Sequence, residues 1–196
     1  YEKNKRKNEK LLLSALTNPG HFEPWIRAMQ EADAPLAGIY TVAQMGGGLL
    51  KKLGKAGARA MLLTYQDHSI RESYLVDGHP LFSRMVPLFD SSIAGIASRL
   101  AAESTKLHQY LAGQRLIRRS EPMPVFILAH PQAVATVRQA CVDTPSLHFE
   151  IIDSHQAARR LDLKTMPSDS SSELLFLHLL ATTPPRQQFA AEAYRH

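Results

Sequence analysis

The chain has 196 residues, of which 44% are hydrophobic, enough for one large domain or two small ones with buried cores. Its mean hydropathy is −0.21, and no apolar run approaches the roughly 18 residues that a membrane span needs. The net charge is +5, but residues 1–10 alone carry five basic and two acidic side chains. The basic balance is therefore a local end effect, and it does not predict a nucleic-acid-binding face.

The first residues and the single cysteine indicate how the chain is processed and where it is located. The chain begins at Tyr1 without a signal-peptide pattern, so we expect a fragment of a longer product. We interpret residues 1–9 as a basic, solvated stub, with contact to anionic lipid or nucleic acid as the alternative. Cys141 is alone, which excludes an internal disulfide and a cysteine-based zinc site and favours a reducing, cytoplasmic location.

Residues 10–55 predict a small βαβ subdomain and a connecting helix. A buried strand over 10–17 ends at an Asn-Pro-Gly turn, and a helix follows that begins near Pro24. A second strand is expected over 36–43, and then a short helix over 43–54 that ends at Gly54. The Gly-Gly-Gly run within this last segment lacks the lysine and hydroxyl residue of a P-loop, and we interpret it as a flexible helix start.

Residues 56–183 predict a larger domain that opens with a meander. Residues 59–65 form a continuous apolar run typical of a central strand. Strands are also expected over 70–76 and 80–88. The Asp77-Gly78 pair between them is a strong hairpin signal, and a polar turn, Gln66-Asp67-His68-Ser69, joins the first two strands.

The meander leads into alternating helices and strands. Helical spacing and capping residues predict a long helix that Asp90 or Ser91 caps and Gly113 ends, a helix that Pro131 opens, and a helix that Ser154 caps. Strands are expected over 123–129 and 147–153. Ser170 and Glu173 have capping-box spacing before a last helix, which is apolar nearly all round and ends at Pro184. We interpret residues 184–196 as a linker.

The order β-β-β-α-β-α-β-α from residue 59 predicts an α/β fold of the ribonuclease-H-like type, which is also the architecture of each half of actin-type ATPases. A two-metal nuclease of this fold needs several carboxylates at the strand ends and on the long helix. The first strand offers Thr64 and no acid, and Glu103 is the single acid of the long helix beyond its cap. One carboxylate cannot hold two magnesium ions, so we reject the nuclease hypothesis.

Residues 61–88, the helix after them and residues 124–134 resemble the actin-like proteins of type IV pilus and type II secretion machinery, the PilM and GspL/MshI group. Residues 78–84, Gly-His-Pro-Leu-Phe-Ser-Arg, match the segment that opens the family's third strand, and residues 147–153 resemble its following strand. The resemblance covers roughly residues 10–165. It implies that most of the first actin-like half lies upstream of Tyr1 and that residues 10–41 correspond to the family's small subdomain.

The resemblance also implies where a nucleotide pocket would lie. The family's phosphate-loop acid falls on Thr64 and its glycine on Gln66, while a hydroxyl residue falls near Ser69. The glycine pair under adenosine falls near Ala129 and His130. Glycine lets the backbone approach phosphate closely, so these replacements argue against ATP hydrolysis.

The remnant pocket keeps two interpretations. Residues 66–69 either reverse the chain only, or hold a changed ligand through donor groups of Gln66, His68 and Ser69, with His130 on the neighbouring strand. The nine histidines show no i, i+4 pair on a helix, so we expect no metal site. We expect no cofactor, with Mg-ATP as the alternative.

We therefore expect a non-catalytic, actin-like scaffold domain at the cytoplasmic face of the inner membrane, within a bacterial pilus or secretion platform. It would bind other platform proteins or a short partner peptide, and a homodimer is a further expectation. Nucleic acid is not an expected partner, and a membrane is reached only through a segment outside this sequence. The alternatives are a degenerate nucleotide-binding switch of the actin-like ATPase superfamily and an unrelated regulatory binding module.

Overall fold

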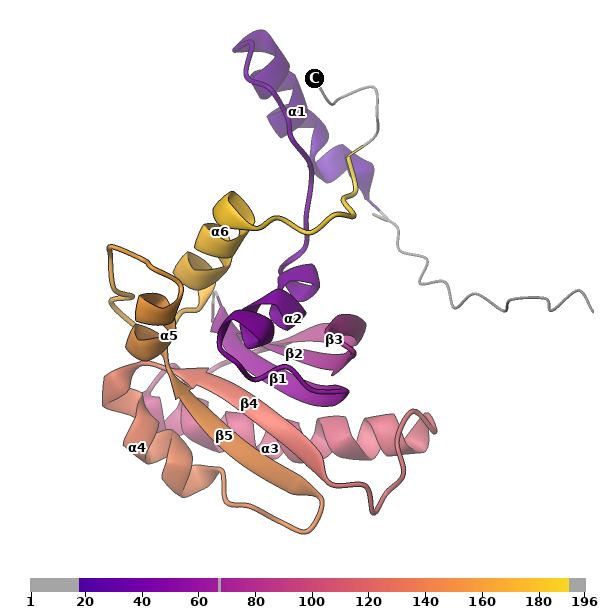
Figure 1. Ribbon diagram of the computed structural model, residues 1–196, viewed down its shortest axis with the longest axis vertical. Coiled ribbons are helices and arrows are strands. Elements are labelled where there is room, and N and C mark those ends of the chain that lie inside the picture. Colours follow the sequence, from indigo (N-terminus) through magenta and orange to yellow (C-terminus); the bar gives the residue numbers. More distant parts are fainter. Residues whose placement is uncertain (1–17, 67, 191–196) are drawn as a thin grey trace, which may run out of the picture. The chain divides into compact units, whose positions relative to one another are not determined.

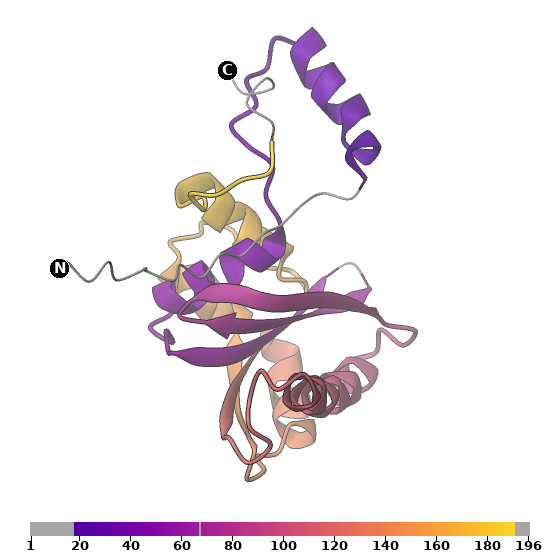
Figure 2. The same ribbon diagram turned by 90° about the vertical axis from the view of Figure 1, so that its right-hand side faces the viewer.

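A computed structural model describes residues 18–66 and 68–190 (Figures 1 and 2). The chain divides into two compact units. Of the described residues, 18–40 and 186–190 belong to the first unit, and 41–66 and 68–185 belong to the second. The second unit contains a five-stranded mixed sheet with helices on both faces, so the α/β class is confirmed.

The first unit contains a short 3-10 helix, η1 (Pro19–His21), and α1 (Glu23–Glu31). The predicted helix near Pro24 is confirmed, with the proline in its first turn, where a missing N–H costs nothing. No residue of α1 is buried, and the Trp25 side chain is 73% exposed. Within the same unit, the Phe189 N–H donates to the carbonyl of Ile39 over 2.8 Å.

The predicted strand over 36–43 is wrong. Residues 34–41 have no regular secondary structure, and α2 (Val42–Lys52) begins where the strand was expected to continue. A capping box explains the difference: the Thr41 N–H donates to Gln44 Oε1 over 2.7 Å and fixes a helix start there. The partner strand expected over 10–17 lies outside the described residues.

The sheet of the second unit has the order β3-β2-β1-β4-β5. Its strands are β1 (Arg59–Gln66), β2 (Ser69–Val76), β3 (His79–Pro87), β4 (Met123–Ala129) and β5 (Leu147–Asp153). The first three form the predicted antiparallel meander, while β4 pairs with β1, and β5 with β4, in parallel. Asp77 and Gly78 both take positive φ at the β2–β3 turn, as a two-residue hairpin requires.

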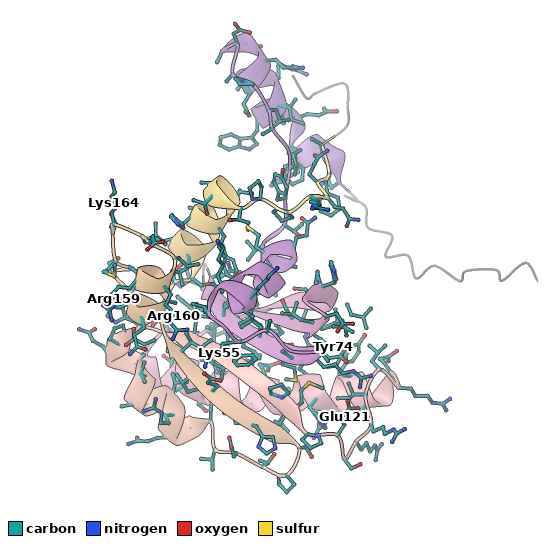
Figure 3. All side chains as sticks on the ribbon, in the orientation of Figure 1. Lys55, Tyr74, Glu121, Arg159, Arg160 and Lys164 are labelled. Atoms are coloured by element: carbon teal, nitrogen blue, oxygen red, sulfur yellow. The ribbon has the colours of Figure 1, made fainter. Side chains whose placement is uncertain are left out.

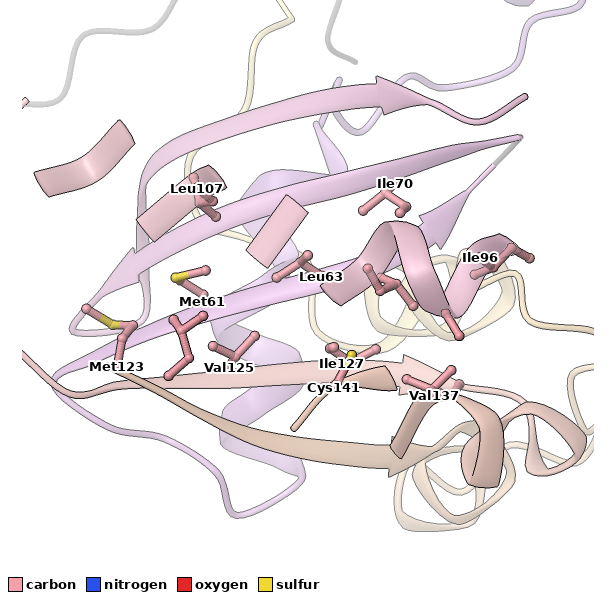
Figure 4. Packing of buried hydrophobic residues seen from close by; sticks show 14 of the residues in the cluster. Met61, Leu63, Ile70, Ile96, Leu107, Met123, Val125, Ile127, Val137 and Cys141 are labelled. Atoms are coloured by element: carbon pink, nitrogen blue, oxygen red, sulfur yellow. The ribbon is translucent and has the colours of Figure 1, made fainter. Parts of the chain in front are cut away.

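Two helical layers cover the sheet. The helices α3 (Ile93–Gly113) and α4 (Pro131–Ala140) lie on one face (Figure 1). The helices α2, α5 (Ser154–Arg160) and α6 (Glu173–Thr182) pack on the other. Alternate residues of the central strands point to opposite layers, so that Met61 and Leu63 pack under α3 while Leu62 packs under α2 (Figure 4). The continuous apolar run of β1 follows from this burial on both faces.

The sequence suggested that the glycines of α2 form a flexible helix start, and this interpretation is wrong. They lie inside the helix, and Gly46 and Gly47 are buried. A Cβ atom at Gly47 would lie 1.8 Å from the carbonyl oxygen of Gly78, so α2 packs directly on the backbone of the β2–β3 turn. The glycine run therefore serves close packing of a helix on a hairpin.

Several helix starts differ by one or two residues from the predicted caps. Ser92 caps α3, its Oγ accepting from the Gly95 N–H over 3.0 Å, and Asp153 caps α5 through the N–H groups of His155 and Gln156. The Ser170–Glu173 capping box is absent, because α6 begins after Ser172. The apolar α6 buries Leu175, Phe176 and Leu179 but leaves Leu177 62% exposed.

Candidate functional site

The four predicted pocket residues lie at the end of the sheet where the parallel strands β1 and β4 terminate. Gln66 ends β1 and Ser69 begins β2, the two are paired across the turn, and His68 lies between them with φ +54°. His130 follows β4, which runs parallel to β1. The structure thus brings Gln66, His68 and Ser69 together in one hairpin. His130 instead contacts the ring of His155, at 4.9 Å between centroids, so His130 lies beside β4 and β5 and not in the hairpin.

The side chain of Gln66 is buried and already engaged. Its Oε1 accepts from Arg71 Nε over 2.8 Å. Arg71 also donates to Ser83 Oγ over 3.3 Å, and Ser83 and Ser73 share a hydrogen bond of 3.1 Å. These four residues form the Arg71 cluster, on the face of β2 and β3 that α2 covers further along the strands.

The charge of Arg71 has no carboxylate partner within ion-pair distance among the described residues. Burial lowers the pKa of its guanidinium, because removal from water disfavours the charged form. The neutral oxygens of Gln66 and Ser83 solvate the cation instead. Sequence analysis missed this residue, although strand alternation places positions 71 and 73 on the face of Gln66, once the hairpin register is known.

The chain itself occupies the position beside the carboxyl end of β1. The β1–β4 pairing covers only Met61–Leu63 with Val125–Ile127, and beyond it Tyr65 pairs with Ser171 in an isolated bridge. The Tyr65 carbonyl accepts from both the N–H and the Oγ of Ser172, each over 3.0 Å. The segment 167–172 therefore lies along the carboxyl end of β1.

The other end of this segment is held near the histidine pair. Nε2 of His155 lies 2.8 Å from the carbonyl oxygen of Pro167, and because a carbonyl can only accept, this ring nitrogen carries the proton. Pro167 and Ser172 are buried at the two ends of the segment. The segment is thus fixed at both ends across the carboxyl side of the sheet.

The position of segment 167–172 bears on ligand binding. In open α/β sheets, ligands bind outside the carboxyl ends of the strands, where neighbouring strands continue in opposite directions. Here β1 continues to β2 on one side and β4 continues to β5 on the other, so the β1–β4 boundary is that point. Segment 167–172 and the engaged Gln66 fill part of this position with protein groups.

A second polar cluster lies on the opposite face of the same strands, under α3. Glu72 on β2 is fully buried and its Oε2 accepts from Arg84 Nε over 2.7 Å. Arg84 also reaches Glu103 on α3, over 3.4 Å. Glu103 further accepts from Lys106 over 2.9 Å, and Arg99 Nε lies 3.2 Å from it. We call these five residues the Glu72 cluster.

The two carboxyl groups of the Glu72 cluster titrate differently. Burial, and a hydrogen bond with Glu103, raise the pKa of Glu72 to about 7, against the opposing effect of Arg84. Burial also acts on Glu103, but Lys106, Glu72 and Arg99 prevail and hold its pKa below the ordinary value. Glu72 Oε1 is buried and has no hydrogen-bond partner among the described residues, which also disfavours the ionised form.

Neither cluster is a metal centre. Within residues 18–66 and 68–190, no three histidine, cysteine or acidic side chains are arranged to hold a metal ion. Cys141 is buried, and burial raises the pKa of its thiol to about 11, which disfavours the nucleophilic thiolate. Across the same described ranges, no helix has both the length and the apolar character to cross a membrane.

No protein-family model matches this sequence, and no curated protein matches it either. The functional argument therefore depends on the geometry of the two clusters and on segment 167–172.

Proposed function

We propose that the chain is a ribonuclease-H-like half of an actin-like protein and works as a non-catalytic scaffold through protein–protein contacts. The sheet order β3-β2-β1-β4-β5, with β2 antiparallel to its neighbours, supports this architecture. The long α3 after the meander and the β4-α4-β5 unit support it too. A pilus or type II secretion platform, at the cytoplasmic side of the inner membrane, is the setting that the sequence resemblance suggests.

The observation that carries the non-catalytic proposal is that the chain itself occupies the carboxyl end of β1. Segment 167–172 is hydrogen-bonded to the carboxyl end of β1, where a nucleotide would need backbone N–H groups free to bind phosphate. The adjacent Gln66 is buried and bonded to Arg71. β1 itself, Arg59–Gln66, has no acidic residue that could position a metal-bound water.

A degenerate nucleotide-responsive switch is the second candidate, and Arg71 favours it. Arg71 is partly buried and has no carboxylate partner among the described residues, so an anionic ligand could supply its counter-charge. In this alternative, the ligand displaces segment 167–172, and the displacement changes the surface that a partner recognises.

Thermal unfolding with and without millimolar Mg-ATP separates the two candidates. A ligand at a hundredfold excess over its Kd adds about 2.7 kcal/mol, which shifts Tm by several degrees. For a scaffold we expect no ATP-specific shift, with Mg-pyrophosphate and Mg-GTP as controls. A shift in the wild type that is lost in Arg71→Met would reject the non-catalytic scaffold and favour the switch.

A further inference from the structure

Most of the large apolar side chains that the second unit exposes belong to β3 and the two elements that follow it. Across both units, nine large hydrophobic side chains are exposed among the described residues, and five of them belong to β3, to the connection after it or to α3. These five are Leu81, Met85, Phe89, Ile93 and Tyr110. Tyr110 joins this surface through its ring contact with Phe82 of β3, at 5.0 Å.

The backbone at this edge is available for pairing. β3 is the last strand on its side of the sheet, and within the described residues no further strand pairs with it. Pro80 and Pro87 lack an N–H near its two ends, but between them alternate residues of 81–86 point their N–H and C=O groups to the outer side, away from β2. An edge strand with exposed apolar residues and free backbone groups is a template for strand addition.

The opposite edge of the sheet, β5, is also unpaired within the described residues, but its side chains differ. β5 exposes no large hydrophobic side chain. Its Glu150 forms an ion pair with Lys55, which is labelled in Figure 3. The His148 side chain is exposed beside Asp143. Charged groups of this kind protect an edge from pairing. The contrast indicates that β3, and not β5, is adapted for a partner.

Solvent reaches several cations on the α3 side of β3, while the connection after the strand exposes the acidic Asp90. In the Glu72 cluster, the side chains of Arg84, Arg99 and Lys106 are 38%, 37% and 55% exposed. The two carboxylates are buried. A partner that approaches from solvent therefore meets cations on the α3 side of the strand and the apolar Leu81 and Met85 on the other side.

We propose that the outer edge of β3 binds an extended segment of a partner protein, which adds as a sixth strand and alternates acidic with apolar residues. Acidic side chains of the segment would face Arg84 and Lys106, and its apolar side chains would cover Leu81 and Met85. A second copy of the chain fits less well, because antiparallel β3–β3 pairing brings the cations of both copies together. This inference rests on the proposed scaffold function and names the kind of partner.

Synthetic peptides of about nine residues, a typical strand length, test the inference on the full chain. One peptide alternates glutamate with valine, a second alternates lysine with valine, and a third has the first composition with a central proline. We expect binding of the first alone by fluorescence anisotropy. Bound peptide should slow amide hydrogen exchange over residues 81–86 and leave the edge of β5 unchanged.

Matched variants locate the site. Met85→Lys places a charge on the apolar side of the edge, and Lys106→Glu reverses an exposed cation; each should weaken binding by about tenfold or more. His148→Lys on β5 and Lys164→Glu on the loop after α5 are the controls, which should bind as the wild type does. All four positions are exposed, and unchanged melting curves verify folding.

Three results would overturn the inference. The acidic peptide could fail to bind, it could bind equally well to Met85→Lys, or it could protect β5 in place of β3. Concentration-dependent dimers that Met85→Lys disperses would assign the edge to a second copy instead. The ATP test above addresses the non-catalytic scaffold separately, so a failed peptide test with no ATP response would reject the β3 edge and leave the scaffold proposal standing.

Discussion

The two faces of β2 and β3 each place an arginine in a polar cluster, and they differ in what offsets its charge. Arg84 meets the carboxylates of Glu72 and Glu103 under α3. Arg71 meets only the neutral oxygens of Gln66 and Ser83 on the other face. The ionic cluster joins three elements and so can fix α3 on the sheet. The neutral cluster lies within a single meander, and no carboxylate of the described residues lies within ion-pair distance of its cation.

The largest expected effect is that of Arg84→Met. Removing the arginine leaves two buried carboxylates close together, and breaking a buried ion pair from one side typically costs 3–5 kcal/mol. Because the Arg84 side chain is partly exposed, we expect a loss of about 3 kcal/mol in the free energy of unfolding at pH 7, measured by urea denaturation. Arg99→Met removes a cation that pairs with Glu103 and not with the fully buried Glu72, and it should cost about 1 kcal/mol or less.

A loss of less than about 1 kcal/mol in the free energy of unfolding of Arg84→Met would contradict the contrast drawn between the Glu72 and Arg71 clusters. It would mean that the Glu72 cluster contributes no more than an exposed ion pair. Acidification provides an internal check on the variant. Without Arg84, both carboxyl groups favour protonation more strongly, so the variant should recover stability as the pH falls toward 5.

The pH dependence of stability distinguishes the clusters next. The pKa of Glu72 is about 7 in the folded chain, above the ordinary value of 4.5. The folded state therefore binds more protons than the unfolded state between these values, and stability is lost as the pH rises through 7. We expect Glu72→Gln to remove about 2 kcal/mol of pH-dependent stability between pH 5 and pH 8.

The measurement is the free energy of unfolding at each pH, from urea denaturation, and its slope against pH is compared between the wild type and Glu72→Gln. The difference between the slopes of the wild type and the variant isolates the contribution of Glu72. Glu173→Gln, at the exposed start of α6, is the matched control and should keep the wild-type slope. Equal slopes for wild type and Glu72→Gln would contradict a raised pKa at Glu72. The lowered pKa of Glu103 acts at lower pH, where stability is lost as that carboxylate is protonated.

The sequence predicted the meander and the later strands well because their signals are local. The run at 59–65 and the Asp77-Gly78 turn are complete within a few residues. The strand expected over 36–43 failed because the Thr41–Gln44 cap outweighed an apolar run that suits either element. The glycines of α2 were misinterpreted because their partner, the Gly78 carbonyl, lies about 30 residues away in the chain.

The candidate site was predictable only in part, for the same physical reason. The hairpin residues Gln66, His68 and Ser69 were found because they are contiguous. Arg71 and Ser83 meet only through the β2–β3 register, and Ser172 reaches Tyr65 across 107 residues of sequence. Long-range hydrogen bonds of this kind leave no periodic signal in a single sequence. The scaffold function, its partners and its location stay predictions.

A smaller effect is expected from Arg71→Met. The substitution removes a partly buried cation that has no carboxylate partner among the described residues, which is favourable. It also leaves Gln66 Oε1 without its donor, which costs about 1–3 kcal/mol when the oxygen is buried. The two contributions oppose each other, so we expect a net change within about 1 kcal/mol, well below that of Arg84→Met. Urea denaturation of both variants under one condition gives the comparison. A loss as large as that of Arg84→Met would imply a counter-charge for Arg71 outside the described residues.

The smallest expected effect is that of Ser83→Ala, which removes the oxygen that links Arg71 to Ser73. Ordinary hydrogen bonds between neutral groups contribute about 1 kcal/mol each, and Ser83 is partly exposed, so water can replace part of what is lost. We expect a loss of about 0.5–1 kcal/mol with an unchanged pH dependence. In the Arg71→Met background, Ser83→Ala should cost less than in the wild type, because the arginine bond is already gone. Strict additivity of the two substitutions would show that Arg71 and Ser83 are not coupled and that the Arg71 cluster is only a set of neighbours.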